Sequence, residues 1–212
     1  MTTSSKTHAK KPAPEKPAAT ERVPHDTPVE CTTPAAWERW LKRHHANAAG
    51  VWLRMAKKAS GIASIDHPEA LEVALCYGWI DGQRRSDDAQ YFLQRFTPRT
   101  PRSTWSQINR AKALKLIDEG RMQPAGLAEV ERARADGRWD AAYEAASTAT
   151  VPPDLQAALD ANRQAAAFFA KLDSRNRFAI LFRIQGAKKA ETRARRIAQF
   201  VQMLAKGEKI HP

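Results

Sequence analysis

The sequence predicts an α+β fold, in which a small, mostly antiparallel sheet packs with helices and an all-helical C-terminal segment follows. Two observations support this prediction. Between residues 51 and 96, two short runs rich in β-branched and aromatic residues have side chains that alternate between two faces, which is typical of strands. After residue 153, apolar residues recur every three or four positions, which is typical of amphipathic helices.

Composition divides the chain into four parts. Residues 1–30 are rich in Ala, Pro and Lys and poor in large apolar side chains, so we expect a disordered tail. Residues 31–146 form the predicted α+β domain, and residues 147–153 (STATVPP) a linker. Residues 154–212 form a basic helical module. The chain has no long apolar run and no apolar segment of a secretory signal, so we expect a cytoplasmic protein.

The first elements have clear start and stop signals. Thr33 followed by Pro34 favours a helix start, and Trp37, Trp40, Leu41 and His44 then lie on one face. Val51, Leu53 and Met55 alternate with Trp52 and Arg54, which predicts a strand. Asp66 and Glu69 resemble a capping box for a helix over about 67–77, which Gly78 would end.

The stretch CYGWIDGQRRSDD, residues 76–88, follows that helix. Trp79 and Ile80 read as a strand, and Asp81-Gly82 as a tight turn. Tyr91 to Phe96 alternates and predicts the next strand, which Pro98 and Pro101 interrupt.

Helices are predicted for most of the remaining chain. Ser103 is the expected cap of a helix ending at Gly120, and Pro124 opens another that buries Leu127 and Val130 and ends before Gly137. Trp139 and Tyr143 are expected in a short helical piece. Four helices follow in the C-terminal part, with Ser174 as the cap of the third and Gly186 and Gly207 ending the last two. The apolar residues that define these four are Leu155, Leu159, Phe168, Phe169, Leu172, Phe178, Leu181, Phe182, Ile197, Phe200, Val201 and Leu204.

Positive charge is concentrated near the C-terminus. The formal net charge is +12, of which residues 171–212 carry +8 and residues 31–170 only +3. Such a patch is typical of a protein that binds polyanions, although a solvated helix surface gives the same pattern. The predicted polyanion-binding residues are Arg175, Arg177, Lys188, Lys189, Arg193, Arg195 and Arg196.

Several kinds of site have no motif in this sequence. No HExxH or paired CxxC occurs, and the adjacent His44 and His45 would point apart on a helix, so we expect no metal. No phosphate-cradling glycine motif is present, so we expect no cofactor. Cys31 and Cys76, the only cysteines, are expected to be free, buried thiols rather than nucleophiles or a disulfide.

Arginines follow residue 83 at high density, and they suggest an anion site. If residues 79–85 and 91–96 pair as strands, several guanidinium groups would converge beside tryptophan rings, which suits a carboxylate or phosphate ligand. The alternative is a packed corner in which the acids pair with the arginines. The predicted ligand-binding residues are Trp79, Asp81, Arg84, Arg95, Arg99, Trp105 and Asn109.

Several motifs resemble the YdeI/OmpD-associated, or bacteriocin-protection, family. They are EVALCYGWIDGQ, YFLQRFTPR, WSQIN, ADGRWDAAY and SRNRFAILFRIQGAKKAETRARRI, and the resemblance covers about residues 33–210. It implies tolerance of bacteriocins or cationic antimicrobial peptides, without a known ligand or reaction. The N-terminal part is more loosely similar to the YjbR and CyaY-like superfamily, but its few acids do not suit an iron chaperone.

These observations favour a non-enzymatic, cytoplasmic, YdeI/OmpD-associated protein of bacteriocin or stress tolerance that binds an anionic ligand or an acidic partner. One alternative is a nucleic-acid or ribosome-binding protein that uses the basic C-terminal helices, for which binding should weaken steeply with salt. Another is an enzyme acting on a small carboxylate or phosphate substrate, which requires an enclosed pocket with a suitable acid or base.

Overall fold

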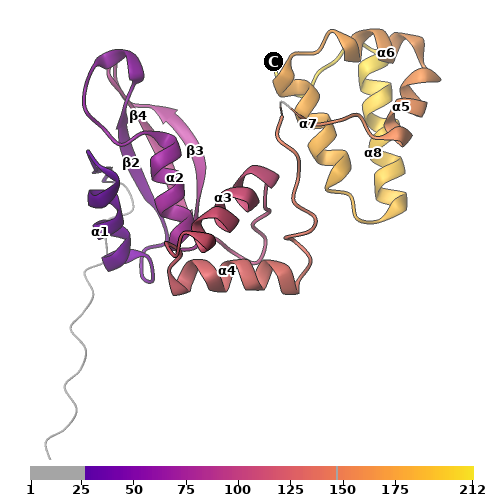
Figure 1. The fold of residues 1–212 in the computed structure, drawn as a ribbon. Helices are drawn as coiled ribbons and strands as arrows, with labels where there is room; N and C mark the ends of the chain where they lie inside the picture. Colours follow the sequence, from indigo (N-terminus) through magenta and orange to yellow (C-terminus); the bar gives the residue numbers. More distant parts are fainter. Residues whose placement is uncertain (1–26, 147) are drawn as a thin grey trace, which may run out of the picture.

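The computed structural model describes residues 27–146 and 148–212. Most of the predicted tail, residues 1–26, and one linker residue, 147, lie outside the described residues. The predicted α+β fold is confirmed: helices pack on one sheet in the first part of the described chain, and helices alone form the last part (Figure 1).

The sheet contains β1 (Val29–Glu30), β2 (Val51–Ala56), β3 (Trp79–Ser86) and β4 (Tyr91–Pro98), in the order β1-β2-β4-β3. Strand β1 runs parallel to β2, and the other neighbours are antiparallel. Val29 and Glu30, which the sequence placed at the end of the predicted tail, form β1.

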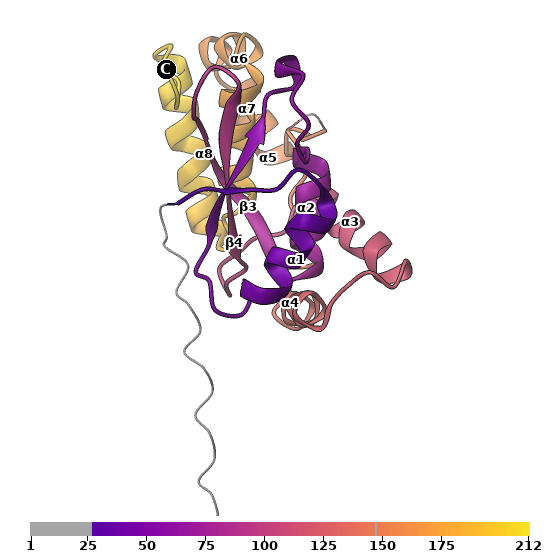
Figure 2. The ribbon, with the colours of Figure 1, turned by 90° about the vertical axis from the view of Figure 1, so that its left-hand side faces the viewer.

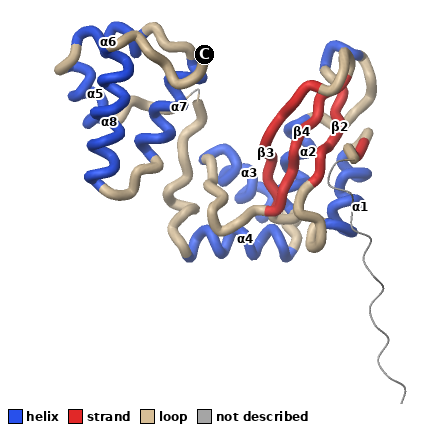
Figure 3. The backbone as a smooth tube through the Cα atoms, turned by 180° about the vertical axis from the view of Figure 1, so that it is seen from behind, coloured by secondary structure: helices blue, strands red, loops and turns tan. Residues whose placement is uncertain are grey.

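Two helices, α1 (Pro34–His44) and α2 (His67–Cys76), cover one face of the sheet, as Figure 2 shows, and leave the other face open toward the viewer of Figure 3. Strand β2 buries Val51, Leu53 and Met55 beneath them, as the alternation predicts. A short 3₁₀ helix (Lys58–Ser60) connects β2 to α2.

Helix α2 has the predicted capping box. The Asp66 carboxylate accepts a hydrogen bond from the Glu69 amide at 2.8 Å, and the Glu69 carboxylate accepts one from the Asp66 amide at 3.0 Å. Gly78 follows the end of α2 and has a φ of +73°, a left-handed conformation that favours glycine. The turn directs Trp79 into β3.

The predicted tight turn at Asp81-Gly82 is wrong. Strand β3 continues through these residues with a bulge, where the Gln94 side chain donates to the Gly82 carbonyl at 3.1 Å. The hairpin turns at residues 87–90 instead. There the Asp88 carboxylate accepts hydrogen bonds from the amides of Gln90 and Tyr91, so its side chain stabilises the turn.

Helices α3 (Gln107–Asp118) and α4 (Pro124–Ala135) follow β4. Ser103 does not cap α3, since its hydroxyl accepts from the Thr100 amide in a turn; Ser106 caps it by accepting from Asn109 at 3.1 Å. Leu127 is exposed rather than buried, because Glu129 and Val130 lie on the inner face of α4.

Trp139 and Tyr143 do not lie in a helix. They belong to an irregular segment in which Ser106 and Tyr143 form an isolated parallel bridge. The Trp139 ring is nevertheless buried, because it packs against Trp105 in the core of the N-terminal part.

Four helices form the C-terminal part: α5 (Pro153–Asp160), α6 (Arg163–Ala170), α7 (Ser174–Gln185) and α8 (Ala190–Ala205). They enclose a cluster of buried residues separate from the one beneath the sheet. Asp173, rather than Ser174, caps α7. Phe182 lies on the exposed side of α7, because Ile180, Leu181 and Ile184 occupy its buried side.

Candidate functional site

A pocket of about 410 Å³ and another of about 320 Å³ lie where the two parts of the chain meet. The smaller, here called the junction pocket, is formed by the loop after β4, the segment after α4 and the end of α7. Its lining residues are Pro101, Arg102, Thr104, Trp105, Arg138, Ala141, Tyr143, Phe182, Gln185, Gly186 and Lys188.

The loop after β4 fixes the position of Trp105. The Arg99 amide donates to the Gly78 carbonyl at 2.9 Å, so this loop is held against the end of α2. The Arg99 side chain donates to the Thr104 carbonyl at 3.1 Å, and its guanidinium lies 3.6 Å from the centre of the Trp105 ring. Trp105 is thus supported from beneath by a buried cation.

The segment after α4 adds the second wall. Trp139 packs edge-on against Trp105 with ring centres 4.9 Å apart, and the Tyr143 amide donates to the Trp105 carbonyl at 3.0 Å. Tyr143 then meets Phe182 of α7 edge-on, again at 4.9 Å. This aromatic contact joins the N-terminal part to the C-terminal helices.

The lining contains three basic side chains, Arg102, Arg138 and Lys188, and no acidic one. Asp136 is close by, but it binds the Arg138 Nε at 2.8 Å and does not line the pocket. Arg102 and Lys188 form no ion pair within the described residues. The pocket is therefore electropositive, and Arg102 and Lys188 can each form an ion pair with a bound anion.

Buried donors without a partner gather beside this pocket. Among the described residues, Arg138 Nη2 and Trp105 Nε1 have no hydrogen-bond acceptor, and neither have Arg99 Nε and Nη2. Buried polar groups are normally paired, so each of these donors is an exception that needs a reason. Trp105 and Arg138 line the junction pocket, although these particular nitrogens are closed off from solvent.

Burial also shifts two pKa values here. It lowers the pKa of Arg99 to about 10, although the nearby Glu129 carboxylate opposes the shift. It raises the pKa of Tyr143, with the Asp81 charge adding to the effect, so the Tyr143 hydroxyl stays protonated at neutral pH and can donate. The site is thus rich in donors.

The structure does not bring all the predicted ligand-binding residues together. Arg84 aligns with Gln94, whereas Arg95 follows Gln94 in β4, so the two arginines lie on opposite faces of the sheet. Arg84 lies 3.7 Å from the Phe92 ring centre and Arg95 lies 5.5 Å from that of Trp52. Only Arg99 and Trp105 of the predicted set stack on each other.

The remaining predicted residues have structural partners. Trp79 is 1% exposed, and its indole donates to the His45 carbonyl at 3.2 Å. Asn109 lies in the first turn of α3, where its amide is capped by Ser106. The first contact gives the Trp79 side chain a role in packing, whereas the second involves only the backbone of Asn109.

Asp81 forms a hydrogen bond with His67, with 3.0 Å between the carboxylate and Nε2. His67 lines another cavity, of about 490 Å³, together with Arg84, Lys57, Lys58 and Asp66. A carboxylate can orient a histidine for proton transfer. However, Asp66 also lines this cavity, which makes it less favourable for an anion than the junction pocket.

The predicted polyanion-binding residues are divided among three environments. Arg193 binds Asp154 and the Ile184 carbonyl, Arg196 donates to the Arg183 carbonyl, and Arg177 lies over the Phe169 ring. Lys189 and Arg195 are exposed. Arg175 and Lys188 line the two pockets at the junction. The basic residues therefore do not form one uniform surface.

Sequence reasoning missed Arg138, Tyr143 and Phe182 as site residues. Tyr143 and Phe182 were treated as parts of helical faces, and Arg138 follows a glycine in a segment without periodicity. The spacing of Phe178 and Phe182 offered one signal, because two aromatic residues four apart among arginines mark an exposed stripe of α7.

Other chemistry has little support among the described residues. Burial raises the pKa values of Cys31 and Cys76 to about 11, which keeps both free thiols protonated and poorly nucleophilic. In residues 27–146 and 148–212, no cluster of three potential metal ligands occurs, and no helix is long and apolar enough to span a membrane.

Comparisons with known families match two separate parts of the chain. Residues 148–207 match the family model described as Bacteriocin-protection, YdeI or OmpD-Associated. The C-terminal helices are a YdeI/OmpD-associated domain. Residues 29–129 match a different model, described as a Domain of unknown function (DUF8412). No curated protein and no solved structure matches the chain.

The YdeI/OmpD-associated domain contributes Phe182, Gln185, Gly186 and Lys188 to the junction pocket. The other lining residues come from outside its matched range, and Trp105 comes from the range of the second match. The pocket therefore depends on both matched regions being present in one chain.

Proposed function

We propose that this protein binds a small anionic ligand that carries a flat ring, and that it does so in the junction pocket. The observation that carries the proposal is the pairing of an acid-free basic lining with unpartnered buried donors on Trp105 and Arg138. Guanidinium groups suit carboxylate and phosphate, and the rings of Tyr143 and Phe182 suit a planar group.

Binding rather than catalysis is the proposed activity, because the lining offers hydrogen-bond donors but no carboxylate or histidine to act as a general base. The description of the matched family supports placing this step in tolerance of bacteriocins or antimicrobial peptides. We propose that the binding takes place in the cytoplasm.

Isothermal titration calorimetry with phenyl phosphate, thymidine monophosphate and inorganic phosphate tests the proposal. We expect both ring-bearing phosphates to bind at least about tenfold more tightly than inorganic phosphate, which corresponds to about 1.4 kcal/mol. In the double variant Arg102→Gln/Lys188→Gln, their affinity should fall at least about tenfold, because two charge-assisted contacts are lost.

Lys189→Gln is the matched control, since it removes one positive charge next to Lys188 from a residue that does not line the pocket. Its affinities should stay within about twofold of the original protein. The proposal fails if no ring-bearing phosphate binds, or if Lys189→Gln weakens binding as much as the double variant does.

A further inference from the structure

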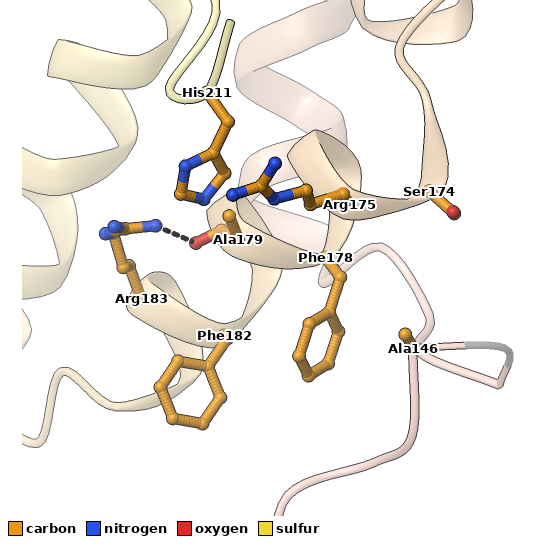
Figure 4. Close-up of a pocket in the computed structure, with 8 residues that line it drawn as sticks. All are labelled: Ala146, Ser174, Arg175, Phe178, Ala179, Phe182, Arg183 and His211. Atoms are coloured by element: carbon orange, nitrogen blue, oxygen red, sulfur yellow. Dashed lines mark hydrogen bonds between the residues drawn. The ribbon is translucent and has the colours of Figure 1, made fainter. Parts of the chain in front are cut away.

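The second pocket, of about 410 Å³ and here called the α7 hollow, shares the lining residue Phe182 with the junction pocket. Figure 4 shows its residues: Phe178 and Phe182 project from one side of α7, Arg175 extends toward His211 on the other side, and Arg183 donates to the Ala179 carbonyl. Because Phe182 lines both pockets, they are neighbours with this ring at their boundary, and the pair is called the groove below.

The sequence of α7 spaces Arg175, Phe178 and Phe182 three and four residues apart, on the side turned away from the buried Ile180 and Ile184. Arg183 directly follows Phe182, so it points toward an adjacent side of the helix. Phe182 is 37% exposed, although a ring of this size is usually buried.

The C-terminal tail is fixed across this face by a buried side chain. Asn176, 1% exposed, accepts a hydrogen bond from the His211 amide at 2.8 Å and donates one to the His211 carbonyl at 3.2 Å. These two bonds hold the His211 imidazole beside Arg175 and Arg183, so the hollow has a defined basic wall.

Aromatic rings follow one another along the groove. Trp105 and Tyr143 lie in the junction pocket, Phe182 lies at the boundary, and Phe178 lies in the α7 hollow. Tyr143 contacts Phe182 at 4.9 Å and Phe178 at 6.3 Å between ring centres, which makes the series continuous.

Charge along the groove has one sign. Arg102, Arg138 and Lys188 line one half, and Arg175, Arg183 and His211 line the other, whereas no Asp or Glu lines either half. Within the described residues, Arg138 is the one member of this set with an ion pair. The groove thus offers basic groups on both sides of a central ring.

We propose that this groove binds single-stranded nucleic acid, with phosphates on the basic residues of both halves and bases against the rings. The proposal rests on the anion binding proposed above and extends it to a ligand with more than one phosphate. Single strands combine repeated anions with accessible ring faces, whereas the bases of a duplex are stacked inside it. An acidic peptide matches the charge but not the series of rings.

Fluorescence anisotropy of labelled oligo-dT of eight nucleotides, compared with calorimetry of thymidine monophosphate, tests this extension with the full chain. We expect the oligonucleotide to bind at least about tenfold more tightly than the monophosphate, and more tightly than a duplex of equal length. Its affinity should also fall as salt rises, because phosphate contacts release counterions.

Two double variants separate the groove from general charge. Arg175→Gln/Arg183→Gln should lower oligonucleotide affinity at least about tenfold and leave monophosphate affinity unchanged. Arg177→Gln/Lys189→Gln removes the same charge outside the groove and should change neither by more than about threefold. Phe182→Leu, which keeps an apolar side chain but removes the ring, should weaken oligonucleotide binding about fivefold or more.

The outcomes distinguish this inference from the function on which it rests. If the monophosphate binds in the junction pocket but the oligonucleotide binds no more tightly, the anion site stands and the nucleic-acid groove is wrong. Equal losses in the two double variants would show binding by charge alone and would also overturn the groove. If neither ligand binds, both proposals are wrong.

Discussion

Arg99 is the buried cation around which the polar residues of the N-terminal part gather. It is 5% exposed, stacks on Trp105 and interacts electrostatically with Glu129, Tyr143 and Asp81. Burial of an arginine costs free energy unless its donors are paired, so the two unpartnered nitrogens on Arg99 lower the stability of the folded state.

Gly78 links this cluster to the fold, because its carbonyl accepts the Arg99 amide. A Cβ atom at Gly78 would lie 2.9 Å from the Ala125 carbonyl oxygen and from the Glu129 Cγ. Gly61 has a similar φ, +69° against +73°, but a Cβ there would meet nothing within 4 Å.

We therefore expect Gly61→Ala to lower the free energy of unfolding by about 1–2 kcal/mol, the usual cost of left-handed backbone for a side chain. Gly78→Ala should cost about 1–3 kcal/mol more, because overpacking adds to the same backbone strain. Urea denaturation followed by tryptophan fluorescence measures both. Equal costs would show that the contacts of Gly78 relax freely.

At the scale of secondary structure, the position of an arginine on its strand or helix decides which way its side chain points. The two-residue period of β4 sends Arg95 to the face opposite Arg84, so a run of arginines in sequence does not become one site. On α8, Arg193 turns inward to the Asp154 carboxylate, whereas Arg195 is exposed. The position of each arginine on its element separates structural charges from available ones.

Replacing Arg193 should therefore affect stability, and replacing Arg195 should not. Arg193→Gln removes a bidentate pair with Asp154 and a bond to the Ile184 carbonyl at 3.1 Å, at an expected cost of about 1 kcal/mol at pH 7. Arg195→Gln removes the same charge from an exposed site and should stay within about 0.5 kcal/mol. Urea denaturation followed by far-UV circular dichroism gives both values.

The difference in the free energy of unfolding between Arg193→Gln and Arg195→Gln should depend on pH. Arg193 lowers the pKa of Asp154, so the pair stabilises the folded state above the ordinary Asp pKa of about 4. That stability is lost as pH falls through the lowered pKa, and the two variants should become equally stable near pH 2. A difference that persists at that pH would mean that the bond to Ile184 dominates.

Across the described chain, apolar burial is divided between two cores. One lies beneath the sheet and includes Trp37, Phe96 and Trp105, and the other lies among α5 to α8 and includes Leu155 and Ile180. The aromatic contact of Tyr143 with Phe182 connects them. Such a small connection suits two regions that unfold separately.

Two optical probes should detect the separate unfolding of the two cores. All six tryptophans lie between residues 37 and 139, so fluorescence reports the first core alone, whereas circular dichroism also reports the C-terminal helices. We expect the two urea transitions not to coincide. Leu155→Ala, in the second core, should shift the dichroism curve and leave the fluorescence curve unchanged. Coincident curves that shift together would contradict two separable regions.

Local patterns in the sequence were sufficient for most elements. The Thr33-Pro34 start, the Asp66–Glu69 capping box and the alternation in β2 all act within a few residues, so each can be recognised without knowledge of the fold. The turn was predicted wrongly because two neighbouring segments both have residues that favour a turn. Asp81-Gly82 and residues 87–90 both suit a turn, and the pairing of β3 with β4 selects the second.

The candidate groove depended on contacts between distant segments. Trp105, Tyr143 and Phe182 are far apart in sequence, and no local pattern records that the bridge to Ser106 and the exposed face of α7 bring their rings together. Charge density near the C-terminus was readable directly. Which of those charges pair internally and which line the groove follows from the packing of α7 and α8, because a short-range ion pair requires both partners in place.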